Sequence, residues 1–429
     1  MTTSYPHYLQ ASGWNALLPT RQAKQSLAND LEVDVAIIGA GYTGLAAAKR
    51  WRELAPDDEI AVIDASEAGE GTPGRHSGFL LEIALANDAR PAQMQRMTQC
   101  NQLLAQAMNR IVGEVEDAAV DTALQRSGVY RAAAGPVGAR ALAQYRAFLQ
   151  AAGLPFEELD RKTMQHKLGS SFYQQGIYSP HCYLAQPAAL VRALVQKLPG
   201  DIALYENTPA TSLRKSGGRW LIETPGATLS AKKVILANNA FSKHLGVGKS
   251  RLVTIYTYAG LTRPIDKELS DSLGSDPSWG VLPTHRLGST LRKMPDGRMM
   301  VRSFYGYEKE TPTALVNKQL RKNLCRRFPQ LDAEELEKVW GGAISFTLGG
   351  GSLWGEVKPG LFVSSGCNGG GVVKGTLFGA CLAELANGKD APDIPALFGH
   401  ANWMPPDPIR SIGFHLTSAV ERFRGRAEI

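Results

Sequence analysis

The sequence predicts an α/β fold, α+β over the whole chain, with one domain around a strand–helix–strand unit and a second around an antiparallel sheet. The first observation is the apolar run at residues 31–38, which is short enough for a buried parallel strand and is followed by a glycine-rich turn and a helix. The second is Pro295-Asp296-Gly297 between the strand-like stretches 289–294 and 298–303, which is typical of a hairpin. The length of 429 residues suits roughly two to three domains.

Composition and charge exclude several classes of protein. Hydrophobic residues make up 44% of the chain, which is too many for a disordered protein, and no stretch has the roughly 18 uninterrupted apolar residues of a membrane-spanning helix. The net charge of +7 is spread along the chain, with a mild basic finish at Arg410, Arg422, Arg424 and Arg426. This charge suits an anionic ligand or weak membrane-surface contact, whereas a clustered basic patch for nucleic acid is absent.

The start of the chain and its cysteines bear on location. The first ten residues, MTTSYPHYLQ, lack the basic and apolar regions of a secretory signal, so none is expected. The cysteines are scattered without CxxC spacing, so we expect neither disulfides nor a metal site, and the reducing cytoplasm is the expected compartment. The five cysteines are Cys100, Cys182, Cys325, Cys367 and Cys381.

The other elements follow from the spacing of apolar residues along the chain. The polar residues 1–30 are expected to form an arm that wraps the body. Periodic apolar positions predict helices at residues 45–55, 88–118, 139–152, 187–198, 314–328 and 372–387. Strand-like runs lie at residues 59–64, 202–205, 220–223, 233–237 and 361–365.

The turn after the first strand carries the motif Gly39-x-Gly41-x-x-Gly44, with Tyr42 and Thr43 inside it. In a Rossmann-like fold these glycines allow a tight turn, the close approach of a pyrophosphate and close packing of the helix on the strand. The helix N-terminus then directs its N–H groups and the positive end of its dipole at the phosphates. The motif therefore predicts a dinucleotide site, and a purely structural turn is the alternative.

An acidic residue ends the next strand. Asp64 lies 20 residues after Gly44, where a carboxylate accepts the ribose hydroxyls of a dinucleotide, and Ala65 follows it. The negative charge of Asp64 would repel a 2′-phosphate, so FAD or NAD is favoured over NADP. No second GxGxxG motif occurs, which argues against a disulfide-reductase type of protein fed by NAD(P)H.

A second glycine-rich loop, residues 69–78, distinguishes between these dinucleotides. With the first motif it resembles the D-amino-acid oxidase family of flavoproteins, in the branch that contains glycine oxidase, sarcosine oxidase and γ-glutamylputrescine oxidase. The resemblance implies FAD as the cofactor. The loop matches the GxGASGRNGG-like family pattern at Gly69, Gly71, Gly74, Arg75 and Gly78, and departs from it at Thr72, Pro73, His76 and Ser77.

The resemblance continues through most of the chain. Residues 234–240 are similar to the strand and turn that close the FAD-binding part, residues 207–210 to its adenine-side segment, and residues 340–342 to the return of the chain to that part. Residues 366–371 open a helix whose N-terminus can stabilise negative charge on the reduced flavin ring. Besides the first motif, Asp64 and Ala65, the resemblance implies cofactor contacts at Gly74, Arg75, His76, Ser77, Pro209, Ala210, Ala237, Asn238, Gly366, Asn368, Gly369, Gly370, Gly371, Val372, Val373 and Lys374.

The family fold implies a division of the chain into two domains. We expect a discontinuous FAD-binding domain made of residues 1–90, 160–250 and 340–429. Residues 91–159 and 251–339 are expected to form the substrate domain, whose antiparallel sheet covers the flavin.

The family binds an amino-acid carboxylate through cationic or tyrosyl groups, which implies candidates for substrate contact. Arg302, Tyr305 and Lys374 are the catalytic candidates. Further candidates in strand-like stretches of the same region are Tyr256, Tyr258, Arg292 and Tyr307. A solvated arginine, a core tyrosine or a surface lysine is the alternative at each position.

The activity implied by the resemblance is FAD-dependent oxidation of a C–N bond in a small-molecule amine or amino acid. Hydride would pass to flavin N5, and the imine product would be hydrolysed by water. Oxygen is the expected electron acceptor. One alternative is a dehydrogenase of the same fold that passes electrons to a quinone or carrier, and another is a flavin-binding protein with low turnover.

We expect the FAD to be bound non-covalently. Some sarcosine oxidase-like relatives attach the flavin through a cysteine before an aromatic–threonine pair, and here Ile344 stands at that place in the stretch Ile344–Thr347. Other relatives attach it through a histidine in the loop after the acidic residue. His76 is displaced from that place by one position, with Arg75 in the matching slot.

Overall fold

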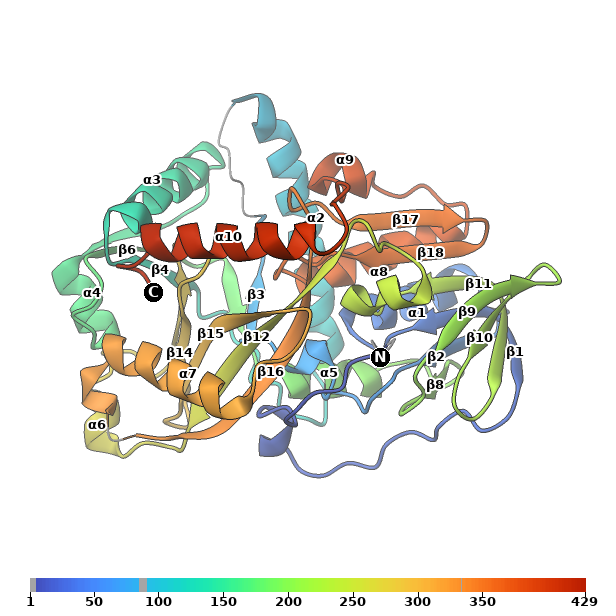
Figure 1. Ribbon diagram of the computed structural model, residues 1–429, viewed down its shortest axis with the longest axis horizontal. Coiled ribbons are helices and arrows are strands. Elements are labelled where there is room, and N and C mark those ends of the chain that lie inside the picture. The colour runs from blue at the N-terminus through green and yellow to red at the C-terminus, as the bar shows by residue number, and fades with distance from the viewer. Residues whose placement is uncertain (1–4, 85–90, 333) are drawn as a thin grey trace.

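The computed structural model describes residues 5–84, 91–332 and 334–429, and a largely parallel sheet organises one half of them (Figure 1). Its strands are β1 (Leu31–Ile38), β2 (Ile60–Ile63), β8 (Ala203–Tyr205), β9 (Ser212–Ser216), β10 (Arg219–Glu223), β11 (Thr228–Leu236), β17 (Leu353–Lys358) and β18 (Leu361–Ser365). The order is β17-β18-β11-β1-β2-β8, with β10 and β9 attached beside β11. Strands β18, β11, β1, β2 and β8 run parallel, as the strand–helix–strand prediction requires.

Helices pack against this sheet and bury its apolar face. They are α1 (Tyr42–Leu54), α2 (Pro91–Val115), α5 (Pro187–Gln196), α8 (Val373–Ala386) and α9 (Ile394–Phe398). Helices α1 and α8 approach so closely that a Cβ on Gly379 would overlap the backbone of Thr43. The two glycine-rich segments that precede these helices are thereby held on neighbouring elements.

The second sheet is mainly antiparallel. Its strands are β4 (Val129–Ala133), β5 (Glu157–Asp160), β6 (Gln175–Ser179), β12 (Val253–Thr262), β13 (Trp279–Pro283), β14 (Thr290–Lys293), β15 (Met299–Tyr307) and β16 (Leu336–Phe346). Their order is β16-β12-β15-β14-β13-β4-β6-β5, and β13 pairs with β4 in parallel. A short antiparallel pair, β3 (Phe79–Leu81) and β7 (Cys182–Leu184), lies outside both sheets.

Different helices cover the two faces of the second sheet. On one face, α7 (Thr313–Arg327) packs against apolar side chains of β12 and β15. On the other, α10 (Ile409–Arg424) crosses the front of the sheet in Figure 1, and its Phe414 joins the cluster formed by Val253 and Ile255. The shorter surface helices of this half are α3 (Pro136–Ala151), α4 (Arg161–Leu168) and α6 (Lys267–Asp271).

Most of the expected elements are confirmed, with small shifts of their ends. The strand at residues 31–38 and the hairpin of β14 and β15 are present, as are the expected helices, although residues 88–90 lie outside the described residues. The helix expected from Leu45 begins at Tyr42, and the strand expected at 233–237 starts at Thr228, since its first residues pair with β10. Helix α10 was not predicted.

The polar N-terminal stretch is an arm that lies along the body, as expected, over its described residues 5–30. Trp14 is fully buried, and its ring meets that of Trp340 edge-on with the centroids 5.9 Å apart. Arg21 donates two hydrogen bonds, of 2.7 and 2.8 Å, to the carboxylate of the buried Glu206. The arm therefore contacts both halves of the molecule.

The expected division into domains stays a prediction, and the sheets show which boundaries to examine. Strand β6 belongs to the second sheet, although residues 160–250 were expected with the first. Most of β16 likewise lies beyond the expected return at residue 340 yet pairs with β12. Helix α2 packs with α8 in the core of the parallel sheet, although residues 91–159 were expected in the other domain.

Among the described residues, none of the helices has the length and apolar character needed to span a bilayer. Within the same ranges, no three or more His, Cys, Asp or Glu side chains gather into a possible metal site. All five cysteines are free thiols.

Candidate active site

The turn between β1 and α1 has the shape that its glycines predict. Gly39 has φ +110°, which suits glycine and strains other residues. A Cβ on Gly41 would lie 2.7 Å from the Pro73 ring, and one on Gly44 would overlap the carbonyl oxygen of Gly39. Because α1 begins at Tyr42, the free N–H groups of its first turn, Tyr42 and Thr43 among them, lie directly after this turn.

Asp64 stands at the carboxyl end of β2, beside this turn. Its carboxylate accepts the N–H of Ala40 at 2.8 Å and the N–H of Ser66 at 2.9 Å. Burial raises the pKa of Asp64, and these hydrogen bonds oppose that shift. The carbonyl of Asp64 accepts the N–H of Thr208 at 2.7 Å, which brings the predicted adenine-side residues Pro209 and Ala210 next to it.

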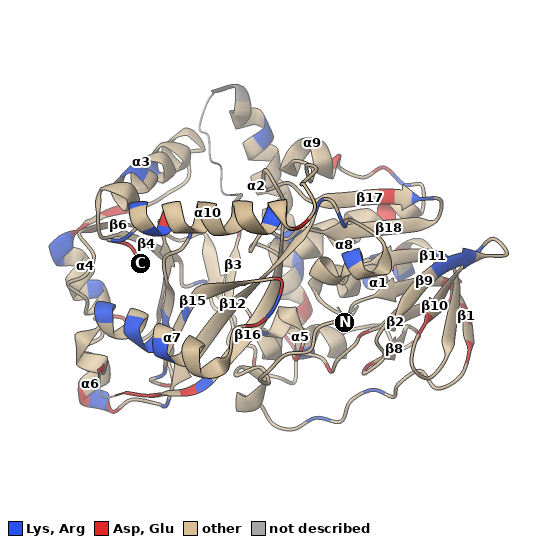
Figure 2. Cartoon of the chain, in the orientation of Figure 1, with Lys and Arg blue, Asp and Glu red and all other residues tan. Residues whose placement is uncertain are grey.

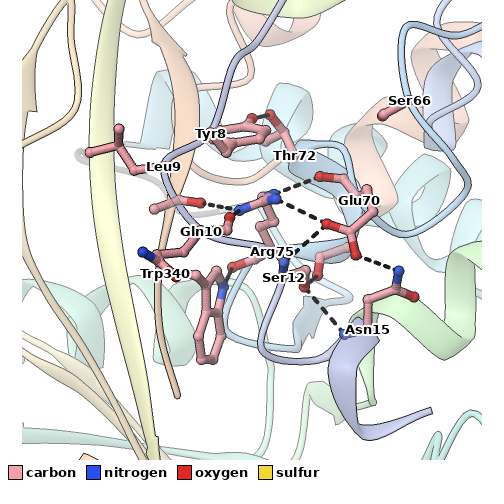
Figure 3. Close-up of polar contacts among 12 residues, drawn as sticks. Tyr8, Leu9, Gln10, Ser12, Asn15, Ser66, Glu70, Thr72, Arg75 and Trp340 are labelled. Atoms are coloured by element: carbon pink, nitrogen blue, oxygen red, sulfur yellow. Dashed lines mark hydrogen bonds and ion pairs between the residues drawn. The ribbon is translucent and has the colours of Figure 1, made fainter. Parts of the chain in front are cut away.

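Arg75 is bound to protein partners on nearly every side (Figure 3). Its Nε donates to the carbonyl of Glu70 at 2.6 Å, and one terminal nitrogen donates to the carbonyls of Gln10 and Gly341 at 2.9 and 3.0 Å. The other terminal nitrogen pairs with the Glu70 carboxylate at 3.1 Å, and the guanidinium lies 3.7 Å from the ring centroid of Tyr8. Arg75 therefore fastens the 69–78 loop to the arm and to β16, rather than offering a free cation to a pyrophosphate.

His76 is held as a neutral ring. The N–H of Gly78 donates to Nδ1 at 3.0 Å, and Nε2 lies 3.0 Å from the hydroxyl of Tyr42, which itself donates to the carbonyl of Pro73. Nε2 therefore carries the proton and donates to Tyr42. Burial, with Arg292 nearby, lowers the pKa of His76 to about 3. Both ring nitrogens are used inside the protein.

The glycine cluster at residues 366–371 is shaped by two asparagines. Gly366 and Asn368 have φ +86° and +50°, and the Asn368 amide donates to the carbonyls of Gly366 and Gly350 at 2.8 and 2.9 Å. The Asn239 amide oxygen accepts the N–H of Gly366 at 3.1 Å. These hydrogen bonds hold the cluster against the end of β11. Helix α8 follows the cluster and begins at Val373, directly after Val372.

Lys374 is the second residue of α8 and lacks an acidic partner among the described residues. Burial lowers the pKa of its ammonium group, and the neighbouring Cys367 opposes that shift. A Cβ on Gly370 would lie 3.2 and 3.5 Å from the Lys374 Cε and Nζ atoms, so the side chain folds back over the glycine cluster. An amine that is desolvated without a carboxylate is unusual in a protein interior.

Arg302 and Tyr305 both lie in β15 of the antiparallel sheet and contact each other. The Arg302 Nε donates to the Thr257 hydroxyl at 3.2 Å, and a terminal nitrogen donates to the Tyr305 hydroxyl at 3.0 Å. The Tyr305 hydroxyl donates a hydrogen bond to the carbonyl of Arg286 at 2.8 Å. Over the described part of the chain Arg302 forms no ion pair, so neutral groups alone hold this half-buried cation.

The other candidates on this sheet have structural partners. Tyr256 and Tyr258 belong to the core against α7, and the Tyr258 hydroxyl accepts the N–H of Thr311. Tyr307 donates to Asp407 at 2.7 Å, before α10. Arg292 is buried and donates to the carbonyls of Ser77 and Ala185 at 3.1 and 2.7 Å. These contacts are with groups of the protein, and a substrate role for these four residues stays a prediction.

Comparison with known proteins decides the family. The DAO family model, described as FAD dependent oxidoreductase, matches residues 34–385. The chain belongs to this family. The resemblance seen in the two glycine-rich loops is therefore confirmed, and the protein is a FAD-dependent oxidoreductase.

The relatives of this oxidoreductase cover most of its length. It is 28% identical over 401 residues, 91% of each chain, to the probable oxidoreductase OrdL of Rhizobium meliloti (strain 1021). It is 24% identical over 371 residues, 85% of each chain, to the gamma-glutamylputrescine oxidoreductase of Escherichia coli (strain K12). The crystal structure of glycine oxidase from Geobacillus kaustophilus matches with a TM-score of 0.73 and 20% identity, over 87% of this chain and 100% of that chain. That likeness confirms the expected fold.

FAD fits the residues of this oxidoreductase. In the turn at Gly39–Gly44 a Cβ on any of the three glycines would collide with neighbouring protein atoms, so these positions present backbone alone, and Asp64 follows β2 beside the turn. At the end of β11 the side-chain oxygen of Asn238 is buried without a hydrogen-bond partner in the described residues. L-α-glycerophosphate oxidase from Mycoplasma pneumoniae, solved with FAD bound, matches with a TM-score of 0.68 and 14% identity over 87% of this chain and 100% of that chain. The cofactor role of each single residue stays a prediction.

Several residues of this region were not predicted. Glu70 and Tyr8 surround Arg75, and Glu206 pairs with Arg21 of the arm beside the predicted adenine-side segment. The position of Glu206, next to the predicted segment 207–210, was an available signal. Nothing in the sequence pointed to Tyr8, because its partners lie far along the chain.

Proposed function

We propose that this FAD-dependent oxidoreductase oxidises the C–N bond of a small amine or amino acid, with an amino-acid carboxylate bound at Arg302. The observation that carries the proposal is the pairing of Arg302 with Thr257 and Tyr305 only. A half-buried guanidinium with no acid partner in the described residues has unused donors, and a carboxylate matches their fork geometry. Glycine oxidase and gamma-glutamylputrescine oxidoreductase, two relatives by similarity, bear names that fit this substrate class.

Each residue has a separate task in this scheme. Arg302 binds the carboxylate, and Tyr305 fixes the guanidinium in place because its hydroxyl joins Arg302 to the Arg286 carbonyl. Lys374 supplies a second desolvated cation from the helix that follows the glycine cluster. The chemistry that FAD supplies when bound is acceptance of a hydride from the carbon beside the nitrogen, which leaves an imine that water hydrolyses.

Orientation and desolvation are the main contributions expected from the protein. An amine that reaches the site in its neutral form can lose a hydride without a dedicated base, so the site needs no acid–base pair. Among the described residues, the candidates around Arg302 are neutral hydroxyl groups, which agrees with this requirement.

The test is an anaerobic screen of the purified holoenzyme. Amino acids, polyamines and cyclic imino acids are added one at a time, and bleaching of the yellow flavin is followed. We expect bleaching by at least one substrate that carries both an amine and a carboxylate. Bleaching only by amines that lack a carboxylate would contradict the proposed role of Arg302. Failure of the whole panel to bleach the flavin would favour the low-turnover flavin-binding protein.

The proposed electron acceptor is oxygen, and a quinone or carrier is the alternative. Stopped-flow mixing of the reduced enzyme with air-saturated buffer distinguishes them. Reoxidation that keeps pace with turnover supports the oxidase, whereas slow reoxidation that a soluble quinone accelerates supports the dehydrogenase.

We also propose that FAD is held non-covalently. Gly78 and Tyr42 occupy the two nitrogens of His76, and the Cys367 sulfur accepts a hydrogen bond from Asn239 at 3.2 Å. Ile344 occupies the place of the flavin-linked cysteine. Acid precipitation should release the yellow colour into the supernatant; colour retained in the pellet would point to His76 or Cys367.

A further inference from the structure

Helix α10 is turned with its polar side toward the protein. Arg410 pairs with Asp407 at 2.9 Å, and Glu421 lies 3.1 Å from His285. Between them Phe414 contacts Tyr307 in a tilted arrangement, with the ring centroids 5.1 Å apart. Most surface helices bury their apolar side and expose their polar side, so α10 is inverted.

The outward side of α10 is an apolar strip. It consists of Ile409, Ile412, Leu416, Val420 and Phe423, whose spacing of three or four residues places them on one face of the helix. Their exposed fractions are 62%, 55%, 64%, 47% and 74%. Of the eleven exposed large apolar side chains in the described ranges, these five and Trp403 are six. Such a concentration marks a surface that something covers.

Exposed basic residues, most of them without an acidic partner among the described residues, surround the strip. Arg422, Arg424 and Arg426 are exposed, and none forms an ion pair in the part of the chain that the structure describes. Arg286 is 73% exposed and lies 3.7 Å from Glu421, which already faces His285. Figure 2 shows basic residues toward both ends of α10 with an uncharged stretch between them. The strip and the basic residues around it therefore match a partner that is anionic and that also binds apolar side chains.

A second copy of the chain fits this surface poorly. Sixteen residues of helix are about 24 Å long and about 10 Å wide, so the strip covers roughly 240 Å². A stable interface needs about 800 Å² from each partner. In a symmetric dimer the patch would also face its own copy, and the arginines around the strip would then repel each other.

We propose that α10 docks the protein on an anionic membrane surface, with the strip inserted among the lipid headgroups and the arginines bound to them. A helix with one apolar face and flanking basic residues lies in the plane of the interface without crossing it. The attraction needs no minimum patch, because each apolar side chain and each nearby arginine adds to it. Trp403, 62% exposed before α10, suits the same headgroup depth.

Docking in this way would bring the candidate substrate face close to the bilayer. Phe414, on the inner side of α10, packs in the same apolar cluster as Tyr305, the partner of Arg302. Helix α10 also lies outside residues 34–385, the part matched by the family model. The inference rests on this helix and its surroundings, and it is independent of the proposed substrate.

The test is flotation of the yellow holoenzyme with vesicles. We expect binding to vesicles of phosphatidylcholine with phosphatidylglycerol, weaker binding at high salt, and little binding to phosphatidylcholine alone. Leu416→Glu and Phe423→Glu should each weaken binding by roughly tenfold or more. Leu385→Glu, at an exposed position of α8, makes the same charge change elsewhere and should leave binding unchanged.

Three results would overturn the proposal. One is the absence of flotation with phosphatidylglycerol at low salt. Another is a Leu416→Glu variant that keeps its flavin spectrum and still floats like the wild type. The third, measured by light scattering, is a wild-type dimer that Leu416→Glu converts to a monomer, which would assign the strip to a second copy.

Discussion

The predicted cofactor side and the proposed substrate side of the candidate site are built from different parts of the chain, backbone on the first and side chains on the second. On the cofactor side, backbone N–H groups and glycines such as Gly39 and Gly44 form the surface, and a side chain is excluded where the chain passes closest to itself. On the substrate side, Arg302 projects from β15 and is positioned by Thr257 on the neighbouring strand. A site made of backbone tolerates almost no substitution at its glycines, whereas a site made of side chains can change its ligand by one replacement.

The largest effect is expected from Gly44→Ala, which tests whether the predicted cofactor side depends on bare backbone. The new Cβ would overlap the carbonyl oxygen of Gly39, and a backbone atom cannot move aside as a flexible side chain can. We expect purified protein without yellow colour, measured as the ratio of flavin to protein absorbance. Gly113→Ala in α2, where a Cβ would meet nothing within 4 Å, is the control and should stay yellow. Full FAD content in Gly44→Ala would refute the backbone account.

The second test removes the cation of the substrate side. Arg302→Ala should weaken binding of a carboxylate inhibitor by about 2–5 kcal/mol, because the anion is left unpaired in a desolvated site. The FAD content should stay unchanged, which titration of the flavin spectrum shows in the same experiment. Arg298→Ala is the matched control, since Arg298 is already paired with Asp296 and Glu337. Equal losses in both variants would mean that the effect is not specific to a carboxylate site.

The third test concerns Arg75, whose contacts join the 69–78 loop to the arm and to β16. Glu70→Gln removes the charge that faces the buried Arg75 guanidinium, and we expect a loss of about 2 kcal/mol in the free energy of unfolding. The control is Glu53→Gln, whose ion pair with Arg50 is solvent-exposed and should be worth about 0.5 kcal/mol or less. Urea unfolding of both holoproteins measures the difference. If Glu70→Gln lowers the free energy of unfolding no more than the control does, the carbonyl acceptors are sufficient to hold Arg75 without the Glu70 charge.

The last test concerns a pH dependence of the stability at His76. The folded protein keeps this ring neutral down to about pH 3, while the unfolded chain takes up a proton below about pH 6.5, so acid favours the unfolded state. Stability should fall by about 1.4 kcal/mol per pH unit from this group between those values. His76→Gln should remove that slope, measured by urea unfolding from about pH 6 to about pH 4. His166→Gln, exposed on α4, should retain it; an unchanged slope in His76→Gln would contradict the neutral ring.

Local sequence was sufficient for the cofactor side because its determinants are close together. The strand at 31–38, the three glycines and Asp64 lie within 34 residues, and hydrophobic pattern and glycine geometry act over such distances. The neutral state of His76 was not predictable, since it depends on burial of the ring, on the nearby charge of Arg292 and on the contact with Tyr42. The contacts of Arg75 with Tyr8 and Gly341 could not be predicted either, because those residues are distant from it in the sequence.

On the substrate side, local sequence was not sufficient. Arg302 and Tyr305 were predicted from a resemblance, and their contact depends on the irregular pairing of β12 and β15 near Thr257. Helix α10 was not predicted, although the spacing of three or four residues between its apolar side chains was an available signal. Only the packing shows that its polar side faces inward.

The arm has a consequence for how the protein is made. Leu9 donates its N–H to Glu310, 301 positions later, and Tyr8 meets the N–H of Ala343, 335 positions later. At roughly 5–20 residues per second, a ribosome adds those positions about 15 to 60 s after it has made the arm. During that interval the 69–78 loop exists without the contacts that lock Arg75 against β16. The nascent loop therefore lacks these contacts until β16 has been made.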